Sequence, residues 1–102
     1  MNKSKILFSH RNPEPESSVL YIVGTPIGNL DDISIRAKNI LENVALIACE
    51  DTRVTRNLLK HLNISNKLVS FHSYNSQQKS KYILSKLNQG ESIALVSDAG
   101  MP

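Results

Sequence analysis

The sequence predicts an α/β domain with a Rossmann-like open parallel sheet and crossover helices on both of its faces. Four short apolar segments alternate along the chain with three segments whose apolar residues recur at helical spacing, which gives the order β-α-β-α-β-α-β. The apolar segments are nearly continuous, and this pattern is typical of strands that are covered on both faces. Strands of this kind are parallel, and their crossover connections are right-handed.

The four expected strands are short runs of mainly aliphatic residues. They cover residues 19–23, 44–49, 67–71 and 92–96. The third run is the weakest, because Ser70 interrupts it. Cys49, the only cysteine of the chain, ends the second run and has no partner for a disulfide, so we expect it to pack in the core of a protein in a reducing environment.

Each expected helix carries one apolar stripe, and start or end signals flank two of them. Asp31 or Asp32 can cap the first helix through its carboxylate. Ser76 can cap the third helix, and Gly90 can end it. The stripes consist of Ile33, Ala37, Ile40 and Leu41 in the first helix, Val54, Leu58, Leu59 and Leu62 in the second, and Ile83, Leu84 and Leu87 in the third.

Length and composition are those of one globular domain. We expect a flexible tail over residues 1–17, which lacks apolar periodicity, and one α/β domain over residues 18–102. An apolar fraction of 40% and a charged fraction of 21% exclude a disordered chain. The apolar runs are too short for a membrane span or a signal peptide, so a cytoplasmic location is expected. A net charge of +3 permits a nucleic-acid partner without requiring one.

Polar or ionisable residues follow every expected strand, and in a parallel sheet these residues meet at one edge, where ligands bind. Glu50, Asp51 and Arg53 follow the second strand, His72 the third and Asp98 the fourth. Asp51 can equally be a helix cap, and His72 alone is more often a half-buried polar residue. A functional role explains Asp98 better than helix capping does, because the residues that follow it, Ala-Gly-Met-Pro, are a poor start for a helix.

The loop after the first strand contains two glycines but matches neither common phosphate-binding motif. Gly24 and Gly28 lack the spacing and the third glycine of the dinucleotide fingerprint, and no Gly-Lys-Ser or Gly-Lys-Thr follows them. In the second helix, Arg53, Arg56 and Lys60 are spaced three and four residues apart and lie on one face. This basic stripe is either a solvated helix face or a phosphate-contacting surface.

Three motifs, LYIVGTPIGNLDDIS, ACEDTRVTRNLL and IALVSDAGMP, occur in this order and closely resemble the ribosomal RNA small-subunit methyltransferase I family of the tetrapyrrole methylase superfamily. The resemblance runs from about Leu20 to Pro102. It implies two α/β domains with S-adenosyl-L-methionine in the cleft between them, and a homodimer. It also implies methyl transfer to the ribose 2′-hydroxyl of a cytidine in the decoding region of small-subunit ribosomal RNA.

On this pattern the chain is an N-terminal domain that stops inside a cofactor-binding loop, so we expect a fragment that is inactive alone. Glu50 and Asp51 would be the catalytic carboxylates, and either could be the general base that takes the proton of the ribose hydroxyl. The cofactor pocket would be lined by Ile27, Asp98, Ala99, Gly100 and Met101, and the RNA would contact Asn29, Arg53, Arg56, Lys60 and His72. No metal is expected. The chain departs from the family pattern at Ser76, where an acid is usual, and at Met101, where threonine is usual.

Three other functions stay open. A methyltransferase of the same superfamily could act on a small tetrapyrrole, although the Glu50–Arg53 block and the basic stripe favour RNA. A dinucleotide-binding module would place Glu50 on the ribose about twenty residues after the glycines, but the glycine spacing counts against it. A non-catalytic scaffold domain is the last alternative.

Overall fold

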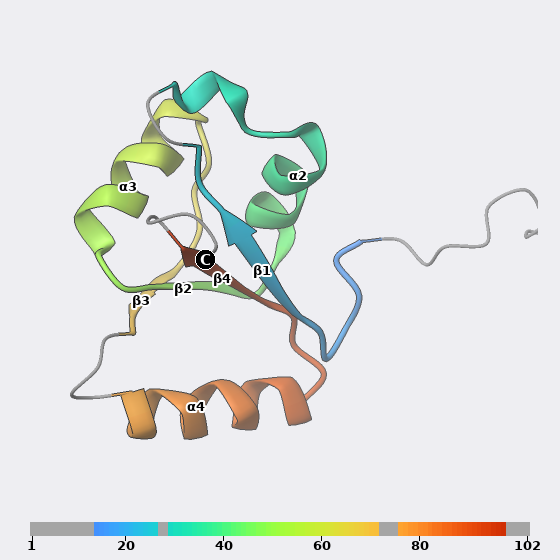
Figure 1. Ribbon diagram of the computed structural model, residues 1–102. Coiled ribbons are helices and arrows are strands. Elements are labelled where there is room, and N and C mark those ends of the chain that lie inside the picture. Colours follow the sequence, from blue (N-terminus) through green and yellow to red (C-terminus); the bar gives the residue numbers. More distant parts are fainter. Residues whose placement is uncertain (1–13, 27–28, 72–75, 98–102) are drawn as a thin grey trace, which may run out of the picture.

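The computed structural model describes residues 14–26, 29–71 and 76–97 (Figure 1). Strands and helices alternate along the chain, with one short 3₁₀ turn before the first α-helix. The strands are β1 (Leu20–Gly24), β2 (Leu46–Cys49), β3 (Leu68–Ser70) and β4 (Ile93–Ser97), and the helical elements are η1 (Leu30–Asp32), α2 (Ile35–Asn43), α3 (Thr52–His61) and α4 (Ser76–Asn88). None of the helices described is long and apolar enough to cross a membrane.

The four strands form one parallel sheet in the order β1-β4-β2-β3. Gly24 is in register with Ser97, while Cys49 is in register with both Val96 and Ser70. The carboxyl ends of the strands therefore reach one edge of the sheet, which we call the carboxyl edge. The predicted α/β fold class with a parallel sheet is confirmed.

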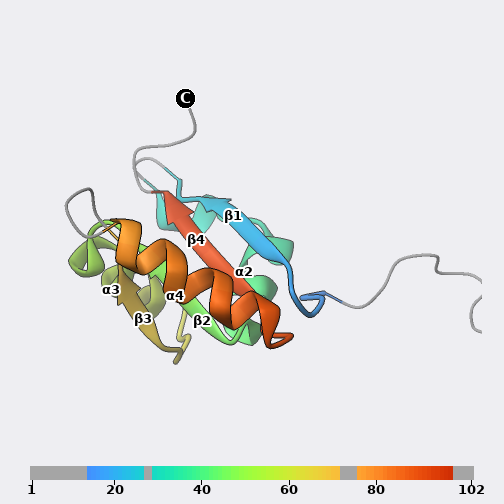
Figure 2. The same ribbon diagram turned by 90° about the horizontal axis from the view of Figure 1, so that it is seen from below.

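Helices cover both faces of the sheet: α2 and α3 lie on one face and α4 on the other (Figures 1 and 2). The side chains of β2 alternate between two core clusters. Ile47 and Cys49 pack with α2 and α3, whereas Leu46 and Ala48 pack with α4. All four side chains are at most 1% exposed. Burial on both faces explains why this strand reads as one continuous apolar run.

The start of α2 differs from the prediction that Asp31 or Asp32 caps it. Both aspartates belong to η1, and Asn29 caps this turn by accepting a hydrogen bond from the backbone N–H of Asp31 at 3.0 Å. The cap of α2 is Ser34, whose Oγ accepts a hydrogen bond from the backbone N–H of Ala37 at 3.0 Å. The prediction was wrong because the aspartates are used in a separate turn before the helix begins.

The end of α4 confirms the predicted role of Gly90. This glycine has a φ of +90°, in the left-handed region that favours glycine. The backbone N–H of Gly90 donates to the carbonyl of Leu87 at 3.0 Å, and that of Glu91 donates to the carbonyl of Lys86 at 3.1 Å. These two bonds form a Schellman motif, which satisfies carbonyls at the helix end.

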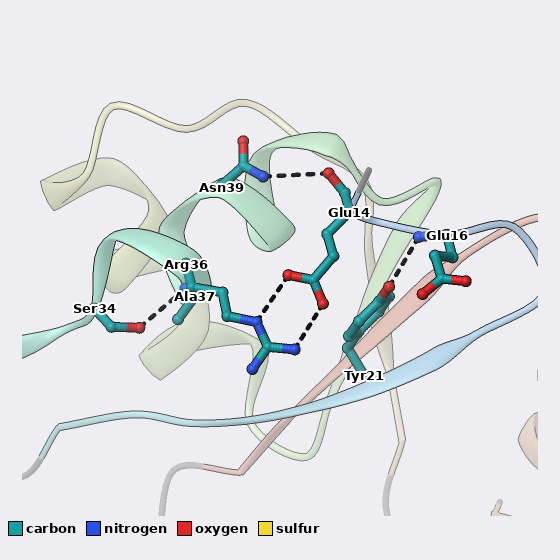
Figure 3. A network of polar contacts seen from close by, with 7 residues as sticks. All are labelled: Glu14, Glu16, Tyr21, Ser34, Arg36, Ala37 and Asn39. Atoms are coloured by element: carbon teal, nitrogen blue, oxygen red, sulfur yellow. Dashed lines mark hydrogen bonds and ion pairs between the residues drawn. The ribbon is translucent and has the colours of Figure 1, made fainter. Parts of the chain in front are cut away.

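The segment before β1 is held against α2, although the sequence predicted a flexible tail up to residue 17. The carboxylate of Glu14 accepts hydrogen bonds from Nε and a terminal nitrogen of Arg36 at 2.8 and 2.6 Å (Figure 3). Through this pairing Glu14 raises the pKa of Arg36. Asn39 donates to the carbonyl of Glu14 at 3.3 Å, and the hydroxyl of Tyr21 accepts from the backbone of Glu16 at 2.8 Å. Residues 14–16 are thus anchored, while residues 1–13 lie outside the described part.

Apolar side chains remain exposed where β1 forms an edge of the sheet. Ile22 on β1 is 57% exposed and Leu84 on α4 is 58% exposed, on the face of the sheet that α4 covers. A cavity of about 290 Å³ lies between α4 and the sheet, and Leu20 and Leu95 are among its lining residues. Side chains are therefore most deeply buried around β2 and β4, and their burial decreases toward β1.

This difference in burial predicts that truncating isoleucine to alanine lowers the free energy of unfolding by different amounts on β2 and on β1. Replacing Ile47 by Ala removes a fully buried side chain from the central strand β2, and we expect it to lower the free energy of unfolding by about 2–5 kcal/mol. The matched change Ile22→Ala on β1 should cost less than about 1 kcal/mol, since that side chain is largely solvated. Urea denaturation of both variants measures the difference, and equal costs would contradict the two-faced core.

Candidate functional site

The carboxyl edge contains a point where the connections leave the sheet in opposite directions. The chain passes from β2 into α3 on one face, and from the neighbouring strand β3 into α4 on the other face (Figures 1 and 2). Such a topological switch point opens a crevice beyond the carboxyl ends of the two strands, where open α/β sheets bind ligands. The residues that follow β2 therefore lie at the position where open α/β sheets commonly bind ligands.

Glu50 is the first exposed residue after the buried strand β2. Just before it, the carbonyl of Cys49 accepts a hydrogen bond from the backbone N–H of Phe71 at 2.6 Å, so β2 and β3 stay paired up to the edge. Within the described residues the side chain of Glu50 makes no hydrogen bond or ion pair. The backbone at Glu50 is thus held in place by the pairing of β2 and β3, and the carboxylate of this residue is available to a ligand.

Asp51 is committed to the start of α3. Its carboxylate accepts a hydrogen bond from the backbone N–H of Arg53 at 2.9 Å and contacts the guanidinium of the same residue at 3.4 Å. Side-chain and backbone hydrogen bonds from Arg53 lower the pKa of Asp51 below its ordinary value. A carboxylate with a lowered pKa is a weaker proton acceptor, so the geometry favours Glu50 over Asp51 as a general base.

The lowered pKa of Asp51 predicts how stability depends on pH. A carboxyl group whose pKa is lower in the folded state stabilises the fold above its unfolded pKa, ordinarily 3.8, and this contribution is lost as the pH falls through the folded pKa. We therefore expect Asp51→Asn, which keeps a capping oxygen but removes the charge, to unfold at lower urea than the unmodified chain at neutral pH. The gap should close below pH 3.8. A gap that is constant across this range would contradict the charge effect.

The basic stripe lies on the exposed surface of α3, as the spacing predicted. Arg53 is 87% exposed and shares the carboxylate of Asp51, whereas Arg56 and Lys60 make no side-chain hydrogen bond or ion pair within the described residues. Residues 52–61 contain no carboxylate. The outer surface of α3 is therefore strongly basic.

Two contacts between loops and helix ends were not predicted from the sequence. His61 Nε2 lies 2.7 Å from Asp31 Oδ1 and joins the end of α3 to η1. The hydroxyl and the backbone N–H of Thr25 both donate to the carbonyl of Ser97, at 3.2 and 3.0 Å. Each contact joins residues that are distant in the sequence, and no local pattern signals such a pairing.

The Thr25–Ser97 contact bears on the expected cofactor pocket. It fastens the segment that leaves β1 to the end of β4, so the two segments expected to line the pocket start side by side. The expected pocket residues, Ile27, Asp98, Ala99, Gly100 and Met101, lie outside the described residues, as does His72.

Asn29 is described and exposed, and its side chain caps η1. No cluster of three or more potential metal ligands occurs among the described residues.

Thr55 is a buried polar residue in α3 that the sequence did not single out. Its side chain is fully buried, and within residues 14–26, 29–71 and 76–97 its Oγ1 has no hydrogen-bond partner. An unpaired buried hydroxyl is destabilising compared with an apolar group of the same shape.

We therefore expect Thr55→Val to raise the free energy of unfolding by about 1 kcal/mol, because it removes the unpaired hydroxyl at nearly constant volume. Urea denaturation measures the change, and Thr55→Ser, which keeps the hydroxyl and loses a methyl group, is the control that should be destabilising. A loss of stability in Thr55→Val would show that the hydroxyl has a partner in the folded chain.

The sequence matches one known family over most of its length. The family model described as Tetrapyrrole (Corrin/Porphyrin) Methylases matches residues 19–102. Similar proteins include the ribosomal RNA small subunit methyltransferase I of Escherichia coli O157:H7, which is 52% identical over 93 residues, covering 91% of this chain and 32% of that protein.

Two further relatives have the same name. That of Vibrio cholerae is 57% identical over 84 residues, covering 82% of this chain and 29% of the relative. That of Mycoplasmopsis pulmonis is 52% identical over 83 residues, covering 81% of this chain and 37% of the relative. The chain thus spans about a third of the length of the curated relatives it matches.

Proposed function

We propose that this chain, which belongs to the tetrapyrrole methylase family, supplies one α/β domain of an S-adenosylmethionine-dependent methyltransferase acting on small-subunit ribosomal RNA. Its similarity to proteins named ribosomal RNA small subunit methyltransferase I carries the proposal, since these relatives are about half identical to the chain. Because the relatives are about three times as long, the activity is assigned to the complete gene product. A ribosomal substrate implies a cytoplasmic location.

The cofactor would be held between the loops that follow β1 and β4. S-adenosylmethionine supplies a methyl group on a positively charged sulfur. The loops that would hold it contain Ile27 on one side and residues 98–101 on the other, and they start at the joined residues Thr25 and Ser97. The carboxylate of Asp98 would favour a cationic ligand through its opposite charge.

The RNA would be positioned at the switch point next to β2 and along α3. A ribose hydroxyl is a poor nucleophile, and a carboxylate within hydrogen-bond reach can accept its proton as the new bond forms. Glu50 fits this role because it is exposed at the carboxyl edge and free of other contacts among the described residues. Asp51 fits a supporting role, since it caps α3 and pairs with Arg53.

The acceptor that we propose is the ribose 2′-hydroxyl of a cytidine in the decoding region. The basic surface of α3 supports an RNA substrate, because Arg53, Arg56 and Lys60 can contact successive phosphates. A homodimer of the complete protein belongs to the same proposal, and it rests on the family resemblance alone.

The decisive experiment replaces Glu50 by Gln in the complete gene product, which keeps the size of the side chain and removes its basicity. We expect methyl transfer to unmodified small-subunit RNA to fall by about 10²–10⁴-fold in kcat, the usual contribution of a general base. Glu42→Gln, at an exposed carboxylate of α2, is the matched control and should leave kcat unchanged.

Alkaline hydrolysis of the product identifies the methylated position, because a ribose 2′-O-methyl group blocks cleavage at that nucleotide. Full activity of the Glu50→Gln enzyme would overturn the assignment of the base. A methylated RNA that alkali cleaves at every position would overturn the ribose assignment. Methyl transfer to a tetrapyrrole and none to RNA would replace the proposed substrate class.

A further inference from the structure

A cavity of about 440 Å³ lies beside β3, at the open edge of the sheet and away from the carboxyl edge. Its volume is within the range of small-ligand pockets. It lies between α3 and the segment that leads into β3, and we call it the α3–β3 groove. Its lining residues are Arg56, Leu59, Lys60, Ile64, Asn66 and Leu68.

The floor of the α3–β3 groove is built by the turn that ends α3. Asn63 has a φ of +59°, its backbone N–H donates to the carbonyl of Lys60 at 3.1 Å, and that of Ile64 donates to the carbonyl of Leu59 at 2.8 Å. These bonds form a Schellman motif, in which the two apolar side chains on either side of the turn commonly touch. Leu59 and Ile64 are 4% and 8% exposed and belong to the core. The floor is therefore apolar and formed before any ligand binds.

A second set of hydrogen bonds fixes the wall of the groove. The amide nitrogen of Asn66 donates to the carbonyls of Leu41 and Val44 at 2.9 and 3.0 Å, and its oxygen accepts from the backbone of Lys67 at 2.7 Å. These bonds tie the segment before β3 to the end of α2. Asn66 is thus a structural residue of the wall, and its amide is occupied by the protein.

The rim of the groove carries two cations that have no protein partner among the described residues, Arg56 and Lys60. They are exposed and lie one turn apart on α3, about 6 Å along the helix axis. Some other cations of the described residues are paired, such as Arg53 with Asp51, and Lys86 with Glu91 at 3.7 Å. None of the groove's lining residues is acidic. The groove thus combines an apolar floor with an unneutralised positive rim.

This combination fits a nucleotide better than a simple anion. A free phosphate would use the cations but not the apolar floor, whereas a nucleotide brings a flat base for the floor and phosphates for the rim. Arginine also stacks on bases through its planar guanidinium. In a duplex the bases are stacked inside and cannot reach the floor, so the ligand class is an unpaired nucleotide of a single strand.

We propose that the α3–β3 groove binds one unpaired nucleotide of an RNA strand, with the base against the half-buried Leu68 and the exposed edges of Leu59 and Ile64, and the flanking phosphates on Arg56 and Lys60. The inference rests on the proposed RNA substrate and adds a second contact region to it. Arg53 and Lys60 are about 10 Å apart along α3. An RNA strand along this helix therefore reaches the groove at one end and the carboxyl edge at the other, so the groove positions RNA without taking part in the chemistry.

Fluorescence anisotropy of the complete gene product with a labelled single-stranded hexaribonucleotide of cytidine tests the proposal. In the chain carrying Arg56→Gln and Lys60→Gln we expect affinity to fall about tenfold, and the slope of log K against log salt to decrease by about 1.4, as two phosphate contacts predict. The control chain carries Lys38→Gln and Lys81→Gln, which remove the same charge from exposed positions on α2 and α4. Its affinity should stay within about twofold of the unmodified chain.

Methyl NMR during the same titration locates the base. Resonances of Leu59, Ile64 and Leu68 should shift, while those of Ile22 and Leu84, exposed on the other face, should not. Equal weakening in both double variants, or no shift at the groove methyls, would overturn the groove assignment alone. Absence of any RNA binding by the unmodified complete gene product would overturn the RNA substrate as well. Competition by polyglutamate as strong as by RNA would replace the nucleotide with an acidic peptide.

Discussion

Burial of the central strands on both faces is the constraint on which the rest of this structure depends. Leu46, Ile47, Ala48 and Cys49 send side chains to opposite sides of β2, and all are almost inaccessible to solvent. A strand of this kind requires helices above and below it, so each connection must leave the sheet and cross one face. Since crossovers are right-handed, the direction of each step along the sheet decides which face its helix covers. The reversal between the step from β2 to β3 and the step from β3 to β4 thus creates the switch point.

The same constraint determines where chemistry is possible. The interior of the sheet has no room for an unpaired charge, so ionisable groups are confined to the ends of the strands. Glu50 is the first residue beyond the buried part of β2, and the Phe71–Cys49 hydrogen bond keeps the neighbouring strand in place up to that point. One residue later, Asp51 caps α3. Two adjacent carboxylates thereby have different surroundings, one satisfied by the helix start and the other exposed at the carboxyl edge.

Sequence patterns predict this fold well because they record burial directly. Continuous apolar runs identified the strands, and Gly90 identified the end of α4, since both features follow from local physical requirements. The strand order β1-β4-β2-β3 leaves no such trace, because a parallel sheet can be wound in several orders with the same alternation of elements. The prediction that Asp31 or Asp32 caps α2 was wrong because several polar residues in one loop can each cap a helix. At the site, the exposure of Glu50 followed from its position after a strand, whereas the groove depends on a turn and a sheet edge brought together by folding.

Helix α3 connects the two regions that the proposals assign to RNA. Its inner side, with Thr55, Leu58 and Leu59, is part of the core, and its outer side carries the basic stripe. Leu59 belongs both to the core and to the lining of the groove, so a ligand there contacts the packing that holds the helix. A ligand that binds only the folded groove stabilises that packing by mass action. The start of the same helix is fixed by Asp51, next to Glu50. Under the two proposals, an RNA strand bound in the groove would be held at a fixed distance from Glu50, because both regions lie on one helix, and this would favour correct placement of the reacting hydroxyl.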